Sequence, residues 1–205
     1  MIPGRDNIPH DRFPFATVAL MLANVVVYAV TGGAPLRTVT VATVFTSMFV
    51  QTSVWQLIGN VWFLWLFGPT VEDSMGVARF LAFYVVGGLI AQGVVLAIDP
   101  GASMPAMGAA GAIATVLGGY VLLYRRARVI ALILVVFFFG VDEIPVLVML
   151  AIWVAMQAAF AAAGYIGDGT VAYASYVGGF LFGLAAIRLV ATRRKPTPPT
   201  AAAYR

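Results

Sequence analysis

The chain has 205 residues, of which 62% are hydrophobic and only 10% are charged. An ordinary soluble domain is about half apolar and about a quarter charged, so this composition is typical of one compact membrane bundle. The absence of cysteine excludes disulfides and a thiol nucleophile. The single histidine, His10, has no second ligand residue with which to hold a metal, so we expect no metal and no other cofactor.

The formal net charge of +4 does not indicate a nucleic-acid partner. The cations form short clusters between apolar runs, with Arg125, Arg126 and Arg128 in one cluster and a second at 193–195. Such clusters are typical of residues that set the orientation of membrane helices. We therefore expect the lipid bilayer as the environment and no nucleic acid as a partner.

Six uncharged stretches are apolar enough to cross a bilayer, which requires about 20 residues in a helix. The segment before the first carries Asp6 and Asp11, unlike the basic start of a signal peptide, so we expect a retained helix. The second stretch is short, but the residues that precede it are also largely apolar. The stretches are Phe13–Thr31, Val54–Phe67, Phe80–Ile98, Met107–Tyr124, Pro145–Gly164 and Thr170–Ile187.

The positive charges predict an orientation for these helices. With six spans and a cytoplasmic N-terminus, 11 of the 12 lysines and arginines lie on the cytoplasmic side of the membrane, and only Arg37 lies on the external side. The positive-inside rule then places both termini in the cytoplasm. We expect a multi-pass protein of a bacterial plasma membrane, with residues 1–12 as a cytoplasmic segment, 13–191 as the membrane domain and 192–205 as a disordered Pro-rich tail.

Two connections have features of their own. Val129–Val141 is strongly apolar, but it is too short to span comfortably, so we expect it to lie at the cytoplasmic interface or to turn back within the protein. The connection from Gly32 to Thr52 is external and apolar, and we expect an amphipathic hairpin in the outer interface.

The polar residues inside the predicted spans leave little room for catalysis. The spans hold no histidine and no pair of carboxylates, and the one lysine, Lys195, is in the tail. Serines are present, but a hydroxyl needs an adjacent base to become a useful nucleophile. Gln56 and Asn60 are four residues apart, hence on one face of the second helix. Their amides are either hydrogen-bonding contacts between helices or donors for a carbonyl oxygen.

Small residues predict which helices touch. Five of the six residues in Met107–Ala112 are glycine or alanine, and Gly179–Gly183 is a GxxxG pattern in the last stretch. Because small residues let transmembrane helix backbones approach closely, we expect the fourth and sixth stretches to be in close contact.

Several motifs, in the right order over nearly the whole chain, resemble the rhomboid family of intramembrane serine proteases. Phe45–Phe49 leads into a stretch, Leu57–Gly68 followed by Val71-Glu-Asp73, that is similar to the family's second helix. Met107–Ile113 resembles the active-site motif G-A-S-G-A-I, and Tyr176–Phe180 resembles H-I-G-G-F. The resemblance implies an all-α bundle of six transmembrane helices, with an external interfacial loop between helices 1 and 2.

In that family a serine opening the fourth helix and a histidine on the sixth form the catalytic dyad. The resemblance places Ala110 at the serine position and Tyr176 at the histidine position. The oxyanion asparagine corresponds to Asn60, its histidine partner to Gln56, and a further histidine before the second helix to Gln51. These replacements together indicate a rhomboid pseudoprotease that is not an enzyme.

The resemblance therefore implies a binding function. We expect Gln56, Asn60, Gly108, Ala110 and Tyr176 to form a site for transmembrane segments of client membrane proteins, which are released intact. We expect clients with Gly- or Pro-containing spans, held through the second and fifth helices.

Two alternatives stay open. The first is an active intramembrane serine endopeptidase, either present here as a mutated form or using an unrecognised site such as Ser175 or Ser103. The second is a lipid-handling or transport protein that uses the open groove of the fold.

Overall fold

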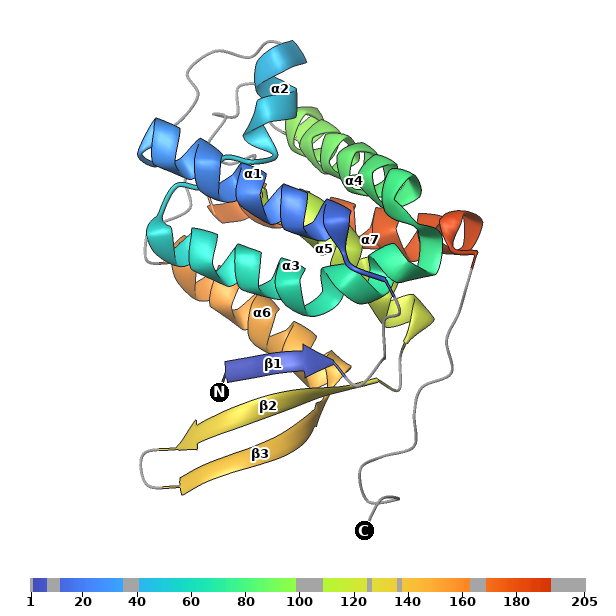
Figure 1. Cartoon of the computed structure of the whole chain (residues 1–205). Helices are drawn as coiled ribbons and strands as arrows, with labels where there is room; N and C mark the ends of the chain where they lie inside the picture. Colours follow the sequence, from blue (N-terminus) through green and yellow to red (C-terminus); the bar gives the residue numbers. More distant parts are fainter. Residues whose placement is uncertain are drawn as a thin grey trace.

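In the part of the chain that the computed structural model describes, seven helices form a bundle with a small sheet along one side (Figure 1). The structure describes residues 2–6, 12–34, 41–98, 109–124, 127–135, 138–162 and 169–192. The helices are α1 Phe15–Thr31, α2 Val41–Ser47, α3 Val54–Met75, α4 Val77–Ile98, α5 Ala110–Leu123, α6 Val146–Ala162 and α7 Gly169–Val190.

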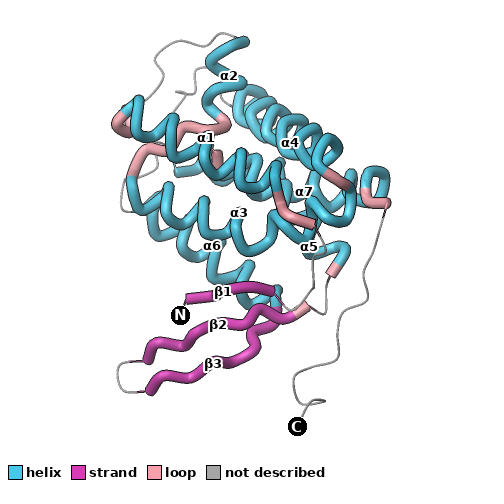
Figure 2. The backbone as a smooth tube through the Cα atoms, in the orientation of Figure 1, coloured by secondary structure: helices cyan, strands magenta, loops and turns pink. Residues whose placement is uncertain are grey.

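Helix α5 is the centre of the bundle. Every residue of this helix except Leu122 is buried, because its side chains are apolar and several are no larger than a methyl group. Helices α3, α4 and α7 pack around it, and α6 lies at the edge of the bundle, as the tube in Figure 2 also shows. The core therefore surrounds the Gly- and Ala-rich start of α5.

The predicted close contact of the fourth and sixth apolar stretches is confirmed in α5 and α7. A Cβ atom added to Gly179 would collide with the carbonyl oxygen of Gly111, and one added to Gly183 would collide with that of Thr115. In the other direction, a Cβ on Gly118 would collide with the carbonyl oxygen of Phe180. The two backbones touch directly, which only glycine at these positions permits.

The connection after α1 differs from the expected amphipathic hairpin. It contains the short helix α2, and Met48 and Val50, which follow that helix, are buried in the bundle. Helix α3 also departs from prediction, because it continues beyond Phe67 to Met75 with Pro69 inside it. Its last two turns are buried against neighbouring helices, and this tertiary packing outweighs the helix-breaking tendency of proline.

A three-stranded antiparallel sheet was not part of the predicted all-α fold. The hairpin pairs β2 (Arg128–Val135) with β3 (Phe138–Pro145), and β1 (Ile2–Asp6) adds to the other edge of β2. The ambiguous segment Val129–Val141 thus turns back on itself, as strands. Its valine, isoleucine and phenylalanine residues favour extended structure, and it is too short to span as a helix.

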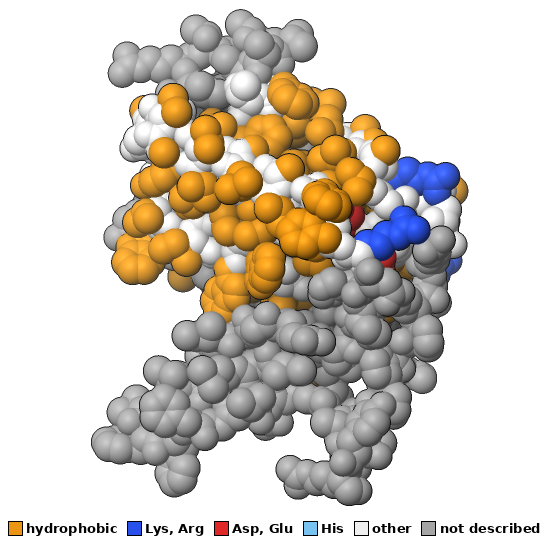
Figure 3. All heavy atoms as spheres, viewed as in Figure 1, with side chains coloured by type: hydrophobic (Ala, Val, Ile, Leu, Met, Phe, Trp, Pro, Cys, Tyr) orange, Lys and Arg blue, Asp and Glu red, His pale blue; other side chains and the backbone are white. Residues whose placement is uncertain are grey.

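The lengths of the observed helices can be compared with the six expected membrane spans. Among the described residues, Val77–Ile98 and Tyr173–Val190 are long and apolar enough to cross a membrane. Three other apolar helical segments are shorter. Apolar side chains cover most of the described surface in Figure 3, whereas the basic side chains gather at one end. Length and composition alone thus identify two of the six expected spans.

A buried carboxylate joins the start of α1 to the end of α3. Pro14 precedes α1 and supplies no side-chain cap. Instead, Glu72 Oε1 accepts from the Ala16 backbone N–H at 3.0 Å, and Glu72 Oε2 accepts from the backbone N–H and the hydroxyl of Thr17, each at 2.8 Å. The negative charge also lies at the positive end of the helix dipole, which favours it there.

Candidate functional site

The two positions that the resemblance assigns to the catalytic dyad lie in one buried cluster. Ala110 is the first residue of α5 and is 1% exposed, while Tyr176 on α7 is 8% exposed. Their neighbours Gly111 and Ser175 are in close contact, so the two helices face each other at this level. The Ala109 N–H donates to the Val50 carbonyl at 3.3 Å, which holds the start of α5 against the segment before α3. A methyl group therefore stands at the position that the resemblance assigns to the nucleophile.

The phenol of Tyr176 is enclosed by aromatic rings and one amide. Its ring lies 5.6 Å from that of Trp153 on α6, and 6.0 Å from that of Tyr173 on its own helix, between centroids. The phenol is hydrogen-bonded to the side chain of Gln56. Since Gln56 Oε1 already accepts from the backbone N–H and the hydroxyl of Thr52, its NH₂ group is the one that remains for the phenol oxygen.

A chain of three buried amides crosses from α3 to α1. Asn60 Nδ2 donates to Gln51 Oε1 at 2.9 Å, and Gln51 Nε2 donates to Asn24 Oδ1 at 2.9 Å. Asn24 Nδ2 in turn donates to the Leu20 carbonyl at 2.8 Å. This geometry favours the interpretation of Asn60 as a contact between helices. Sequence reasoning missed Asn24, although an uncharged polar residue inside the first apolar stretch was a usable signal.

The other residues expected at the site divide into two groups. Gly108 and Ser103 lie outside the described residues. Ser175 is buried on α7, where its Oγ lies against Gly111 and has no hydrogen-bond partner in the described part of the chain. No His, Cys, Asp or Glu group that could hold a metal occurs among the described residues. The surroundings of Ser175 that the structure describes are thus apolar and supply no general base.

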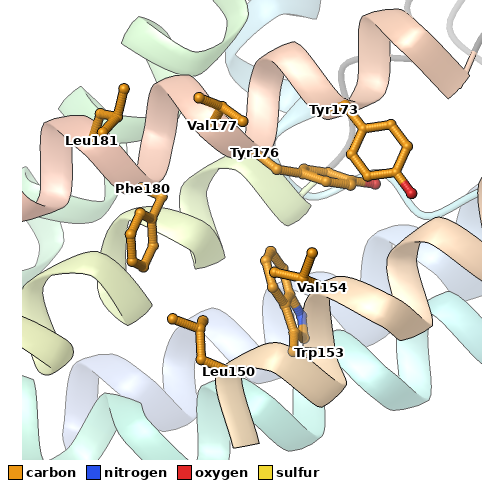
Figure 4. Close-up of a pocket in the computed structure, with 8 residues that line it drawn as sticks. All are labelled: Leu150, Trp153, Val154, Tyr173, Tyr176, Val177, Phe180 and Leu181. Carbon is orange, nitrogen blue, oxygen red and sulfur yellow. The ribbon is translucent and has the colours of Figure 1, made fainter. Parts of the chain in front are cut away.

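A cavity of about 170 Å³ lies between α6 and α7 and reaches Tyr176 (Figure 4). Its lining is entirely aliphatic and aromatic, and the rim residues Val154, Val177 and Leu181 are about half exposed. An apolar cavity of about 150 Å³ accommodates a benzene ring, so this space suits one large apolar side chain. The lining residues are Leu150, Trp153, Val154, Tyr173, Tyr176, Val177, Phe180 and Leu181.

Helix α6 separates this cavity from α3. Met149 and Trp153 are buried toward the bundle, and the Trp153 ring lies 6.1 Å from that of Phe63 on α3. The opposite side of α6 is exposed, with Leu147 and Val148 among its residues. The arrangement provides an apolar helix at the edge of the bundle beside an apolar cavity and buried amides, with no charged side chain lining that cavity.

Comparison with known proteins matches this chain to the rhomboid domain over residues 38–193. The chain is 31% identical over 141 residues to presenilin-associated rhomboid-like protein A, mitochondrial, of Danio rerio, covering 67% of this chain and 34% of that protein. The presenilin-associated rhomboid-like proteins of Rattus norvegicus and Mus musculus, also mitochondrial, are each 29% identical over 140 residues, or 67% of this chain and 35% of theirs. The chain thus spans about a third of the length of these relatives.

Proposed function

Because this chain belongs to the rhomboid family, we propose that it is a rhomboid-fold membrane protein that binds transmembrane segments of client proteins without cleaving them. The observation that carries the proposal is the pair of residues at the dyad positions, Ala110 and Tyr176, which are buried together. Alanine has no oxygen for attack, and a phenol stays protonated at neutral pH. In a soluble serine protease, loss of the nucleophile or the base costs a factor of about 10⁶ in rate.

The surface around α6 supports client binding. The cavity beside Tyr176 can hold one apolar side chain, and the amide of Gln56 contacts the same tyrosine. Asn60 lies one turn further along α3. Glycine weakens a client helix, and proline removes one of its backbone hydrogen bonds, so such spans offer unpaired carbonyl groups that seek donors in lipid. These properties favour Gly- or Pro-containing spans held between α3 and α6, near Ala110 at the start of α5.

Photocrosslinking in native membranes tests client binding. We place a photoreactive residue at Trp65 on α3 or Val154 on α6, each 48% exposed. Trp153 is unsuitable as a probe position because it is only 2% exposed. We expect adducts from both positions whose mass is the sum of this chain and an uncut membrane protein.

The control is the same residue at Leu89 on α4, which is 41% exposed and should yield lipid adducts only. Equal protein adducts from all three positions, or none from α3 and α6, would contradict a client site at these helices. A fluorophosphonate probe should leave every serine unlabelled. Stoichiometric labelling of Ser175 or another serine would instead favour the protease alternative.

The proposal includes a topology of six spans, formed by α1 and α3 to α7, with both termini on the cytoplasmic side. The starts of α1 and α4 and the end of α7 lie at one end of the bundle, because Glu72 binds α1 and Ser74 accepts from the Thr192 N–H at 3.0 Å. Arg12 precedes α1, Arg79 is in the first turn of α4 and Arg188 is in the last turn of α7, so all three belong to this end. The positive-inside rule expects such residues on a cytoplasmic face.

Cysteine labelling checks this orientation, since the chain has no cysteine of its own. A single cysteine at Ala202 should react with a membrane-impermeant maleimide only after the cells are opened. Labelling of intact cells would contradict the topology. The bacterial plasma membrane stays a prediction, and the names of the three relatives say mitochondrial.

A further inference from the structure

The indole of Trp153 on α6 is a buried hydrogen-bond donor without an acceptor. The side chain is 2% exposed, and its Nε1–H makes no hydrogen bond within the described segments of the chain. An indole nitrogen donates but does not accept, so only an acceptor can satisfy it. Because a buried polar group without a partner costs free energy, native structures rarely leave one without a reason. The unpaired N–H points to an acceptor that a ligand supplies.

The polar groups around the indole are donors as well. Trp153 lines the cavity between α6 and α7, and the other polar side chains of that lining are Tyr173 and Tyr176. The indole nitrogen and the two phenol oxygens lie on the side of the cavity toward the start of α7 (Figure 4). The Tyr176 oxygen already accepts from Gln56, so its O–H proton is left to donate. The lining thus offers an indole N–H and phenol O–H groups, and no carboxylate or amide oxygen.

The neighbouring amides on α3 are already used inside the bundle. Gln56 binds Tyr176 through its NH₂ group and Thr52 through its oxygen. Asn60 Nδ2 donates to Gln51 Oε1 at 2.9 Å. The indole N–H differs from both amides, because a ligand that accepts from it breaks no hydrogen bond in the described part of the protein.

The position of Trp153 suits a membrane helix as the ligand, and this inference rests on the client binding proposed above. The indole ring lies 6.1 Å from that of Phe63 on α3 and 5.6 Å from that of Tyr176 on α7, between centroids. The next residue, Val154, is about half exposed at the rim of the cavity. A client that places an apolar side chain in the cavity therefore brings its backbone beside the indole. Helix α6 lies at the edge of the bundle, where it can shift to uncover the nitrogen without parting α5 from α7.

We propose that Trp153 is the residue by which this protein recognises proline-containing client spans. An intact helix bonds its own carbonyl groups, but proline removes one donor and leaves the carbonyl four residues earlier unpaired. In lipid this carbonyl has no water to bind. The Trp153 N–H donates to it, so that two groups that are each unpaired when apart satisfy each other in the complex.

Binding of model clients tests the proposal. The protein is placed in phosphatidylcholine vesicles with a fluorescent transmembrane peptide of about 20 leucine and alanine residues, which carries either proline or alanine at its centre. We expect the protein to bind the proline peptide about tenfold more tightly, the gain from one hydrogen bond that satisfies two buried groups. Trp153→Phe keeps an aromatic ring but has no N–H, so the ratio of the two affinities should fall to about one.

The matched control is Trp55→Phe, the same substitution at the start of α3, where the indole is 61% exposed and does not line the cavity. This variant should prefer the proline peptide as the parent does. Because phenylalanine is also smaller than tryptophan, a second variant carries β-(3-benzothienyl)alanine at position 153, which keeps the bicyclic shape with sulfur in place of N–H. It should lose the preference too. An unchanged ratio in this variant, or in folded Trp153→Phe, would overturn the proposal.

Vibrational spectroscopy reports on the donor itself. A resonance Raman band of indole responds to hydrogen bonding of its N–H, and the difference between the parent and Trp153→Phe isolates Trp153. We expect an unpaired N–H in vesicles without peptide and a hydrogen-bonded N–H after the proline peptide is added. A hydrogen-bonded N–H before any peptide is added would show that lipid or water satisfies the donor, and the proposal would fail.

These outcomes separate the role of Trp153 from client binding as a whole. If the parent protein binds both peptides with equal affinity, recognition of proline by Trp153 is refuted while client binding stands. If it binds neither peptide and photocrosslinking at Trp65 and Val154 yields no protein adduct, the client site is refuted together with the role of Trp153.

Discussion

Gly179→Ala is expected to lower the free energy of unfolding by about 3 kcal/mol or more, the upper range for overpacking a well-packed core. The added Cβ would collide with the carbonyl oxygen of Gly111, which belongs to the backbone of a buried helix and cannot turn aside as a flexible side chain would. Relief requires α5 and α7 to separate along their whole contact. The measurement is the thermal unfolding of the purified protein in detergent, followed by circular dichroism.

Gly93→Ala provides the matched control, because it makes the same change within α4. A Cβ at Gly93 meets nothing within 4 Å, so alanine should raise stability by up to about 1 kcal/mol through its higher helix propensity. The two substitutions should therefore shift the melting temperature in opposite directions. Equal melting temperatures for the two variants would show that α5 and α7 do not touch as the structure has them.

Glu72→Gln is expected to lower the free energy of unfolding by about 3 kcal/mol. This is comparable to the cost of removing one partner of a buried ion pair. The carboxylate accepts three hydrogen bonds from Ala16 and Thr17, whereas an amide offers one oxygen and turns its NH₂ group toward a backbone donor. The same unfolding measurement detects the loss. The variant should also be cleaved by added protease near the start of α1 faster than the parent protein.

Thr17→Val is the graded comparison for Glu72→Gln. It removes only the hydroxyl hydrogen bond at 2.8 Å and should cost about 1 kcal/mol. Because the two residues share one contact, the double variant should be less destabilised than the sum of the single variants. Strict additivity would mean that Glu72 does not act through α1.

The extent to which the sequence predicts this fold varies from element to element. The α5–α7 contact was predictable because glycine spacing alone determines which helix faces can approach each other. The end of α3 was not, because Pro69 and Glu72 both indicate an end to an apolar helix, and only packing against α1 explains why it continues. The pairing of β1 with β2 joins segments more than a hundred residues apart, which no local pattern encodes.

The candidate site shows a similar division. Ala110 and Tyr176 were identified because their neighbours resemble a known motif, and the structure buries both in one cluster. The resemblance marked Gln51 only as a replaced histidine, while its hydrogen bonds to Asn60 and Asn24 depend on three separate segments meeting. The cavity between α6 and α7 is bounded by ordinary apolar residues, so composition could not distinguish them from lipid-facing ones.

The capping of α1 by Glu72 has a consequence for biosynthesis. The carboxylate that completes the first turn of α1 comes 55 residues after Thr17 in the chain. When the ribosome has made α1, the amides of Ala16 and Thr17 have no partner yet, and water or lipid headgroups must serve until α3 follows. We therefore expect the first turn of α1 to become firmly held only once α3 has been made.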